Sequence, residues 1–330
     1  MNAMMQAWAL PVAALAAAAM GFSIQRGATC TVAAVAEIVE ERRATRLLAM
    51  AEAALWVAVG VWSAQRLGWL GQAPPGYALG AWTLAGAALL GLGALLNRAC
   101  VFGAIARLGS GEWAYLATPL GFFLGCRSVD ALFAPGAAQP LALGSVLPDA
   151  PQWLVALLAL ALAWRAVVLF RAGRAPEQQR VGWSPHSATV LIGATFLVTL
   201  LLAGAWAYTD LLADLARGMG QNVWARALLA LALLLGAMLG GWSAGLLRMQ
   251  RPSAPALLRC LAGGMLMGWG SLLLPGSNDG LILLGMPLLW PYAWAAFATM
   301  GLTIGAAMLL QGGRLRALAG SARARKAANL

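Results

Sequence analysis

The sequence predicts an all-α polytopic membrane protein with about nine transmembrane helices and several short re-entrant half-helices. Hydrophobic residues make up 62% of the 330 residues and charged residues only 10%, whereas a soluble domain carries about 25% charged residues. Nine apolar segments are long enough to cross a bilayer, which takes about 20 residues. Polar or glycine- and proline-containing breaks end several of these segments, and they predict the half-helices.

The predicted spans follow one another with little chain between them. The first apolar run has no basic segment before it, so we expect no cleavable signal peptide. The 39 glycines and many alanines are typical of closely packed transmembrane helices. Because little chain remains for a soluble domain, we expect one membrane domain over residues 1–330. The spans are residues 5–24, 48–66, 78–96, 113–133, 152–170, 187–208, 223–247, 257–274 and 286–311.

Two long breaks divide the chain into halves that we expect to be pseudo-repeats. The segment 134–151 is rich in Pro, Gly and Ala, and the segment 172–187 is basic and polar. Residues 1–150 then form the first half and residues 151–330 the second. Many transporters consist of repeated halves, and their broken helices form the substrate site near the bilayer midplane.

The basic residues are distributed in a way that predicts the orientation in the membrane. The loops 68–77 and 134–152 contain no Lys or Arg. By the positive-inside rule the basic loops are cytoplasmic, so we expect a cytoplasmic C-terminus and, after nine crossings, a periplasmic N-terminus. The net charge of +11 then reflects orientation and contact with anionic membrane lipid, and we expect no nucleic-acid partner. The residues concerned are Arg42, Arg43, Arg46, Arg165, Arg171, Arg174, Arg180, Arg248, Arg251, Arg259, Arg314, Arg316, Arg323, Arg325 and Lys326.

Several chemistries find no support in the sequence. The four cysteines show no C-x-x-C pair and no histidine at a ligand spacing, which argues against zinc, an iron–sulfur cluster or c-type haem. The one histidine, His186, stands at a loop-to-helix boundary, where we interpret it as polar punctuation. No phosphate-binding G-x-x-x-x-G-K-[ST] motif occurs. We therefore expect no cofactor, no metal and no enzyme activity.

An arrangement around cysteine occurs twice. A glycine stands nine residues before the cysteine in Gly21–Cys30 and in Gly91–Cys100, and Gly268–Ser277 repeats the spacing with a hydroxyl in place of the thiol. The apolar run breaks at each of these places. Short helices are predicted after the breaks, over Thr31–Glu41, Val101–Leu108 and Leu281–Gly285.

These turns are candidates for a row of sites for one small ligand. Irregular backbone at membrane depth persists only where protein or a water-filled cavity satisfies its polar groups. A half-helix N-terminus offers N–H groups and partial positive charge to an anion, and a thiol adds a soft, polarizable donor. The predicted path residues are Cys30, Cys100, Ser277, Asn278, Arg26, Gln25, Asn97, Arg98 and Asp279.

Each of these features also has a structural interpretation. Buried cysteine is often only a small hydrophobic residue, and we favour this for Cys126 and Cys260. Arg26 and Arg98 either draw an anion toward the path or snorkel to the interface. Asn-Asp-Gly is ordinary turn chemistry. Arg127 and Asp130, at i and i+3, predict a structural ion pair near the end of the fourth span.

Four motifs carry a resemblance to a known family. They are Gly21-Phe22-x-Ile24-Gln25-Arg26-Gly27-x-x-Cys30; Asn97-x-x-Cys100-Val101-Phe102-Gly103-x-Ile105-Ala106-Arg107-Leu108; Gly121-x-x-x-Gly125-Cys126; and Pro275-Gly276-x-Asn278-Asp279-Gly280-Leu281-Ile282-Leu283. With them the chain resembles the YeeE/YedE family of bacterial inner-membrane proteins, which includes thiosulfate permeases. The resemblance implies an hourglass-shaped helical protein that takes up thiosulfate or a related sulfur compound along a central path of cysteine thiols.

Cys30 and Cys100 match two of the family's thiols, whereas Ser277 stands where a third cysteine is expected. Serine lacks the softness of sulfur and cannot form a persulfide, so the substrate can differ from thiosulfate. The main interpretation is a permease for a small sulfur-containing anion. One alternative is a sulfur or selenium relay that uses a cysteine persulfide and a TusA-like cytoplasmic carrier. Another is a structural subunit of a redox complex.

Overall fold

Helices make up the regular structure of the part of the chain that the computed structural model describes, residues 3–71, 74–134, 139–141, 145, 147–172, 183–220 and 222–328. Only two isolated β-bridges accompany them there, Tyr77 with Pro140 and Glu112 with Gln250. Nine helical segments in these residues are long and apolar enough to cross a membrane. The predicted all-α polytopic class with about nine spans is therefore confirmed.

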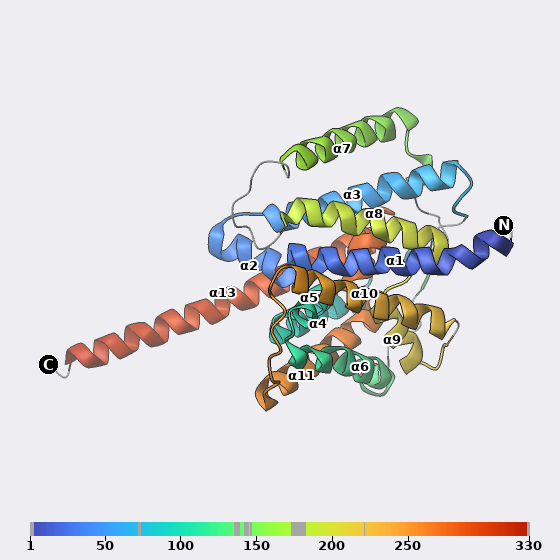
Figure 1. Cartoon of the computed structure of the whole chain (residues 1–330). Helices are drawn as coiled ribbons and strands as arrows, with labels where there is room; N and C mark the ends of the chain where they lie inside the picture. Colours follow the sequence, from blue (N-terminus) through green and yellow to red (C-terminus); the bar gives the residue numbers. More distant parts are fainter. Residues whose placement is uncertain are drawn as a thin grey trace.

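The order of the elements repeats one unit, a long helix, a short helix and a second long helix (Figure 1). Helix α7 separates the first two units from the last two. The bounds are α1 Ala3–Gly27, α2 Thr31–Glu41, α3 Thr45–Arg66; α4 Ala81–Asn97, α5 Val101–Gly109, η1 Trp113–Leu116, α6 Ala117–Phe133; η2 Leu147–Asp149, α7 Gln152–Ala172; α8 Pro185–Ala203, α9 Tyr208–Ala216, α10 Val223–Ser243; α11 Ala254–Leu273, α12 Asn278–Gly280, the π-helix η3 Leu281–Gly285, and α13 Pro291–Ala328.

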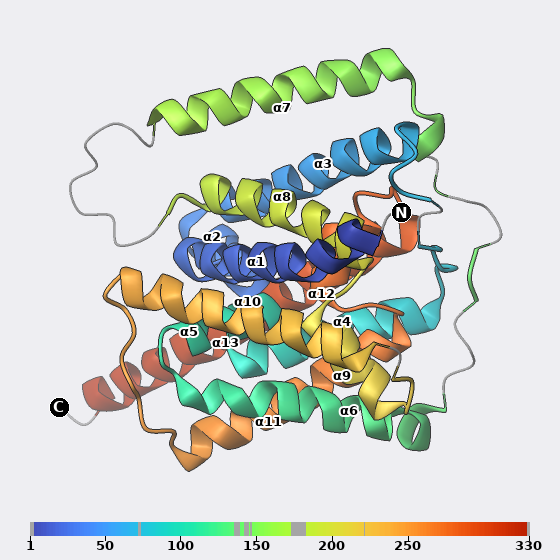
Figure 2. The same ribbon diagram turned by 45° about the vertical axis from the view of Figure 1, so that its right-hand side comes forward.

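The packing of α8–α13 corresponds to that of α1–α6. When α8–α13 are matched in order with α1–α6, the contact of α1 with α10 corresponds to the contact of α8 with α3. The contact of α4 with α13 corresponds in the same way to the contact of α11 with α6. The equivalent helices α1 and α8 are in contact, as are α4 and α11. Exchanging the two sets reproduces these contacts, as expected for repeated halves. Helix α7 lies at the edge of the bundle, and within the described residues its main contacts are with α3 and α8 (Figures 1 and 2).

The glycines that stand nine residues before each turn lie at contacts between long helices. A Cβ on Gly21 would lie 1.8 Å from the Leu233 carbonyl oxygen of α10. One on Gly91 would lie 2.8 Å from the Met300 oxygen of α13, and one on Gly268 would lie 2.3 Å from the Phe122 oxygen of α6. In each of these three helices, therefore, the close contact with another long helix lies nine residues before the cysteine or serine that follows the break.

The basic segments lie at one end of the helical bundle. The α2–α3 turn, the end of α7 and the α10–α11 connection are at the end where the C-terminus lies, and the N-terminus is at the opposite end (Figure 1). These segments hold most of the basic residues used to predict orientation. Arg174 and Arg180 lie outside the described residues. The arrangement puts the basic loops on one side, as the positive-inside rule requires.

Some predicted boundaries are wrong. The span expected over 187–208 ends at Ala203, where Gly204 has a left-handed φ of 82°, and a separate helix, α9, follows. The last span begins at Pro291 instead of 286, because η3 and a turn occupy the preceding residues. Helix α10 ends at Ser243, earlier than 247. Of the two predicted linkers, residues 135–138, 142–144, 146 and 173–182 lie outside the described part.

His186 is more than polar punctuation. Its Nδ1 lies 2.6 Å from Oε2 of Glu52, and Nε of Arg165 lies 3.3 Å from Oε1 of the same carboxylate. Glu52 is buried on α3, and its two partners come from α8 and α7. This cluster joins the three helices with polar contacts at a place where α7 has few others.

We expect Gly21→Ala to destabilise the protein. The new methyl group would meet the backbone of α10, which cannot rotate away, and overpacking of this kind costs about 1–3 kcal/mol. The melting temperature of the detergent-solubilised protein, followed by size-exclusion chromatography, should therefore fall. Gly71→Ala is the control, because a Cβ there meets no atom within 4 Å. Equal melting temperatures for both variants would show that α1 and α10 do not pack this closely.

Candidate functional site

The two cysteine motifs end and restart a helix in the same way. The residue that follows α1, Ala28, has a φ of 46°, and the residue that follows α4, Arg98, has a φ of 61°. In each, the next N–H bonds to a carbonyl five residues earlier, Thr29 to Ile24 at 3.2 Å and Ala99 to Ala94 at 3.0 Å. This is the usual left-handed helix end. The following cysteine, Cys30 or Cys100, is extended and is the N-cap of the next short helix, as predicted.

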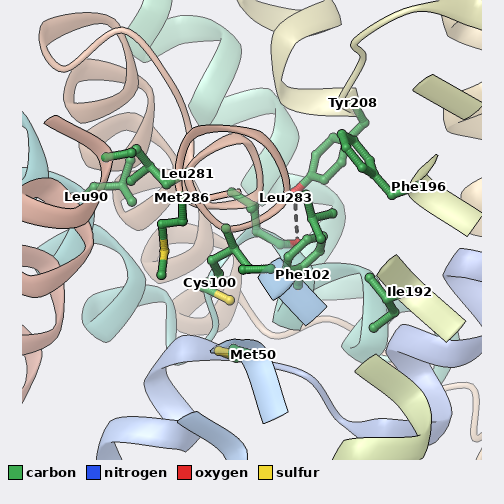
Figure 3. Packing of buried hydrophobic residues seen from close by; sticks show 14 of the residues in the cluster. Met50, Leu90, Cys100, Phe102, Ile192, Phe196, Tyr208, Leu281, Leu283 and Met286 are labelled. Carbon is green, nitrogen blue, oxygen red and sulfur yellow. Dashed lines mark hydrogen bonds between the residues drawn. The ribbon is translucent and has the colours of Figure 1, made fainter. Parts of the chain in front are cut away.

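Each thiol sulfur accepts a hydrogen bond from the backbone of the other motif. The Cys100 N–H donates to Sγ of Cys30 at 3.4 Å, and the Thr31 N–H donates to Sγ of Cys100 at 3.3 Å. The side chains are only 8% and 0% exposed, respectively, and Figure 3 shows Cys100 among Phe102, Leu281 and Met286. The N-termini of α2 and α5 therefore meet at a pair of thiols inside the protein.

Ser277 belongs to a second polar cluster beside this pair. As the N-cap of α12 it donates to the Asp279 carboxylate, and its Oγ lies 2.9 Å from Oγ1 of Thr209. Asn278 joins the clusters, since its Nδ2 donates to Oγ1 of Thr31 at 3.1 Å. Oδ1 of Asn278 is buried and accepts no hydrogen bond in the described part of the chain. It is an acceptor that a bound ligand or water can satisfy.

Helix α9 also begins at this centre, and sequence reasoning missed it. The Tyr208 hydroxyl donates to the Val101 carbonyl at 3.0 Å, which ties α9 to the first turn of α5 (Figure 3). Thr209 approaches both oxygens of Asp279 at 3.2 and 3.1 Å. The main signal was Gly204 inside an otherwise apolar run, with the first strongly polar residues, Thr209 and Asp210, five and six positions later.

The other predicted path residues lie around the turns. Asn97 is fully buried, donates to the Ala99 carbonyl at 2.8 Å and accepts from Thr118 at 3.0 Å, so it holds the turn before Cys100. Gln25 donates to Oγ of Ser110 at 3.3 Å. Arg26 is half-buried and Arg98 is exposed. No hydrogen bond within the described residues joins either arginine to a cysteine.

Two cavities lie on the α9 side. The larger, about 770 Å³, lies between the ends of α6 and α9 and is lined by Cys126, Arg127, Asp130, Arg217 and Met219, among others. The expected ion pair of Arg127 with Asp130 is wrong: no salt bridge joins these two described residues, and both side chains border the cavity. Arg127 and Arg217 thus border the same cavity.

The smaller cavity is about 40 Å³ and adjoins the central clusters. Phe102, Tyr208, Asp210 and Asp279 are among its lining residues. Asp210 lies on α9, outside the nine spans. Burial is the main cause that raises the pKa of Asp210 to about 7, and the nearby Asp279 carboxylate adds to the rise. A protonated fraction of Asp210 is therefore present at neutral pH.

Interrupted helices that meet in the interior define a multi-pass membrane protein of the transporter class, in which such breaks form the substrate site. Residues 26–307 match the model of the family described as sulphur transport. The chain therefore belongs to the sulphur transport family, YeeE/YedE, and its role is that of a sulfur transporter. None of the curated proteins compared with the chain matches it.

We expect Gly103→Ala to impair transport. The new Cβ would lie 2.7 Å from Sγ of Cys30, so the thiol has to move away from the Cys100 N–H. Uptake of a labelled sulfur anion should fall by about tenfold if the shift costs about 1.4 kcal/mol. Gly280→Ala is the matched control on the opposite short helix, where the nearest atom, Oγ of Ser277, lies 3.9 Å from the new Cβ. Equal uptake by both variants would contradict the role of the thiol's position.

Proposed function

We propose that the protein is a bacterial inner-membrane permease that takes up a small sulfur-containing anion such as thiosulfate. The observation that carries the proposal is the pair of N–H···S hydrogen bonds between the two thiol motifs, from Cys100 to Sγ of Cys30 and from Thr31 to Sγ of Cys100. It combines two thiols with the N-termini of α2 and α5, helices of 11 and 9 residues. Membership of the sulphur transport family supports a sulfur compound as the substrate.

The chemistry of the pair suits an anion that must bind and leave again. Sulfur is a weak acceptor, so an anionic oxygen or sulfur can replace it on the Cys100 and Thr31 N–H groups. The displaced thiols can then donate their S–H protons to the anion. Partial positive charge at the two helix N-termini adds to the attraction. Each contact is weak, and conduction requires that no site holds its ion too tightly.

The proposed path begins at the larger cavity and ends at the basic side of the bundle. Arg127 and Arg217 concentrate the anion at the mouth, which the positive-inside rule makes periplasmic. The anion then passes Ser277 and Asn278 and reaches the thiol pair. Arg26 and Arg98 lie near the ends of α1 and α4, where they favour the anion on the cytoplasmic part of the path. We also propose that the chain forms a single membrane domain, with residues 1–150 as its first half and residues 151–330 as its second half.

A sulfur relay is the second candidate, and the contact between two buried thiol groups favours it. A Cys30 or Cys100 thiolate would attack the outer sulfur of thiosulfate, forming a cysteine persulfide and releasing sulfite. A TusA-like carrier at the cytoplasmic side would then accept the sulfur. Unlike hydrogen-bonded passage, this route requires a covalent adduct and a thiol that serine cannot replace.

We expect Cys100→Ala to reduce uptake far more than Cys260→Ala. Both thiols are 0% exposed, but only Cys100 contacts the other thiol motif, so burial alone predicts the same effect for both. Uptake of radiolabelled thiosulfate, sulfite, sulfate and selenite into proteoliposomes measures the difference and identifies the substrate. Near-wild-type uptake by both variants would defeat the proposed thiol path.

Cys30→Ser and Cys100→Ser separate the two candidates. A hydrogen-bonding path tolerates a hydroxyl in part, as it does at Ser277, whereas a persulfide relay loses all activity. Mass spectrometry of the wild-type protein after thiosulfate exposure shows whether a sulfur atom has been added. A trapped persulfide together with inactive serine variants would replace the permease proposal with the relay.

We expect Arg127→Gln with Arg217→Gln to weaken uptake mainly at low salt. Loss of two positive charges lowers the local anion concentration, an effect that is largest when the Debye length is long. The apparent KM should rise several-fold at about 10 mM ionic strength and less at about 150 mM. Arg66→Gln is the control, because Arg66 is exposed at the same end of the bundle and bonds to the Pro148 carbonyl. An equal effect of Arg66→Gln would leave the cavity without a special role.

A further inference from the structure

Asp279 is a buried carboxylate without a cationic partner. It is 4% exposed and accepts hydrogen bonds from the Ser277 hydroxyl and from the Gly280 N–H at 3.1 Å, while Thr209 lies within 3.2 Å of both its oxygens. Within the described residues no Arg, Lys or His forms an ion pair with it. A charge buried without a partner is costly, and a carboxyl group in such a place tends to bind a proton.

The groups that face Asp279 make the ionised form still less favourable. Helix α9 presents Asp210 and Tyr208 across the small cavity, and Cys100 lies beyond Tyr208 at the start of α5. Helix α3 carries no titratable side chain from Ala53 to Gln65, and α13 carries only Tyr292 between 291 and 312. The titratable groups named here, two tyrosines, a cysteine and an aspartate, are all acids, so none of them supplies a positive charge that would compensate an ionised Asp279.

Asp279 also lies beside two other residues of the proposed path. Its hydrogen-bond partner Ser277 is a path residue, and the neighbouring Asn278 contacts Thr31 beside the thiol pair. An ionised Asp279 would repel an anion held at these residues. A protonated Asp279 is neutral and has an O–H donor to offer. The adjoining cavity of about 40 Å³ has room for a water that can pass a proton to the carboxylate.

We infer that Asp279 binds and releases one proton in each transport cycle, so that the anion and a proton move inward together. The inference rests on the proposed permease function and adds its driving force. The proton comes from water on the periplasmic side and binds to a carboxylate oxygen of Asp279. It passes to water on the cytoplasmic side once the anion has left. Only O–H bonds form and break.

Proteoliposomes with a clamped zero membrane potential test this inference. Labelled thiosulfate is offered with an acidic outer and a neutral inner buffer, and the accumulation ratio is measured at steady state. For one proton per anion the ratio should rise about tenfold per pH unit. Asp279→Asn cannot bind the proton and should lose this dependence, whereas Asp279→Glu should restore it. A pH-sensitive dye inside the vesicles should report proton uptake only with the titratable variants.

Asp214→Asn is the matched control, because Asp214 lies on α9 but pairs with Arg226 at the surface; it should keep the wild-type response. Asp210→Asn should keep the response but shift it toward lower pH, since a like charge beside Asp279 is lost. A pH response that survives Asp279→Asn, or that disappears only in Asp210→Asn, overturns the inference. Wild-type uptake that shows no pH response also overturns the inference, but it leaves the permease proposal intact. No uptake of any sulfur anion overturns both.

Discussion

The structure depends on one constraint: polar backbone groups freed by a helix break inside a membrane must find partners within the protein. Here the breaks satisfy one another. The Cys100 and Thr31 N–H groups bond to sulfur, and Tyr208 bonds to the Val101 carbonyl. Because each break supplies the partner for another, the contacts that hold the short helices in place also build the candidate site. A substitution in the wall of the site therefore also changes contacts that hold the short helices.

The two sides of the centre differ in chemistry although their helices correspond. On the side of α2 and α5, weakly accepting sulfur holds the N–H groups, which an anion can readily take over. On the side of α9 and α12, a hydroxyl cluster is bound to the carboxyl group of Asp279, which repels an anion whenever it is ionised. The hydroxyl of Ser277 fits this division, because a hydroxyl bonds to Asp279 more strongly than a thiol does. The pair of thiols is then the part suited to a soft anion.

The sequence indicated the thiol turns because their signals are local. A break in an apolar run, a helix-ending residue and a following amphipathic pattern predicted Cys30 and Cys100 at the starts of short helices. Helix α9 was missed because Trp206 and Tyr208 keep the run apolar, so Gly204 was the main sign of a break. Arg127 borders a cavity that the end of α9 helps to form. Because α9 was not predicted, this position of Arg127 was not predicted either. Pairing of Glu52 with His186, 134 residues apart, depends on how α3 and α8 pack, which local patterns do not encode.

The distribution of hydrogen bonds indicates where the closed centre opens. The Cys30 and Cys100 motifs are joined by hydrogen bonds from backbone N–H groups to the thiol sulfurs, and Ser277, Thr209 and Asp279 form a second connected group. Between the groups run the Asn278–Thr31 and Tyr208–Val101 bonds. The two groups can therefore separate as units when only the bonds between them are exchanged for bonds to a ligand. An anion can replace Oγ1 of Thr31 as the acceptor for the Nδ2 group of Asn278, and the Asn278 side chain can then turn its buried Oδ1 toward water. We therefore expect the path to open between α2 with α5 on one side and α9 with α12 on the other, as alternating access between two halves requires.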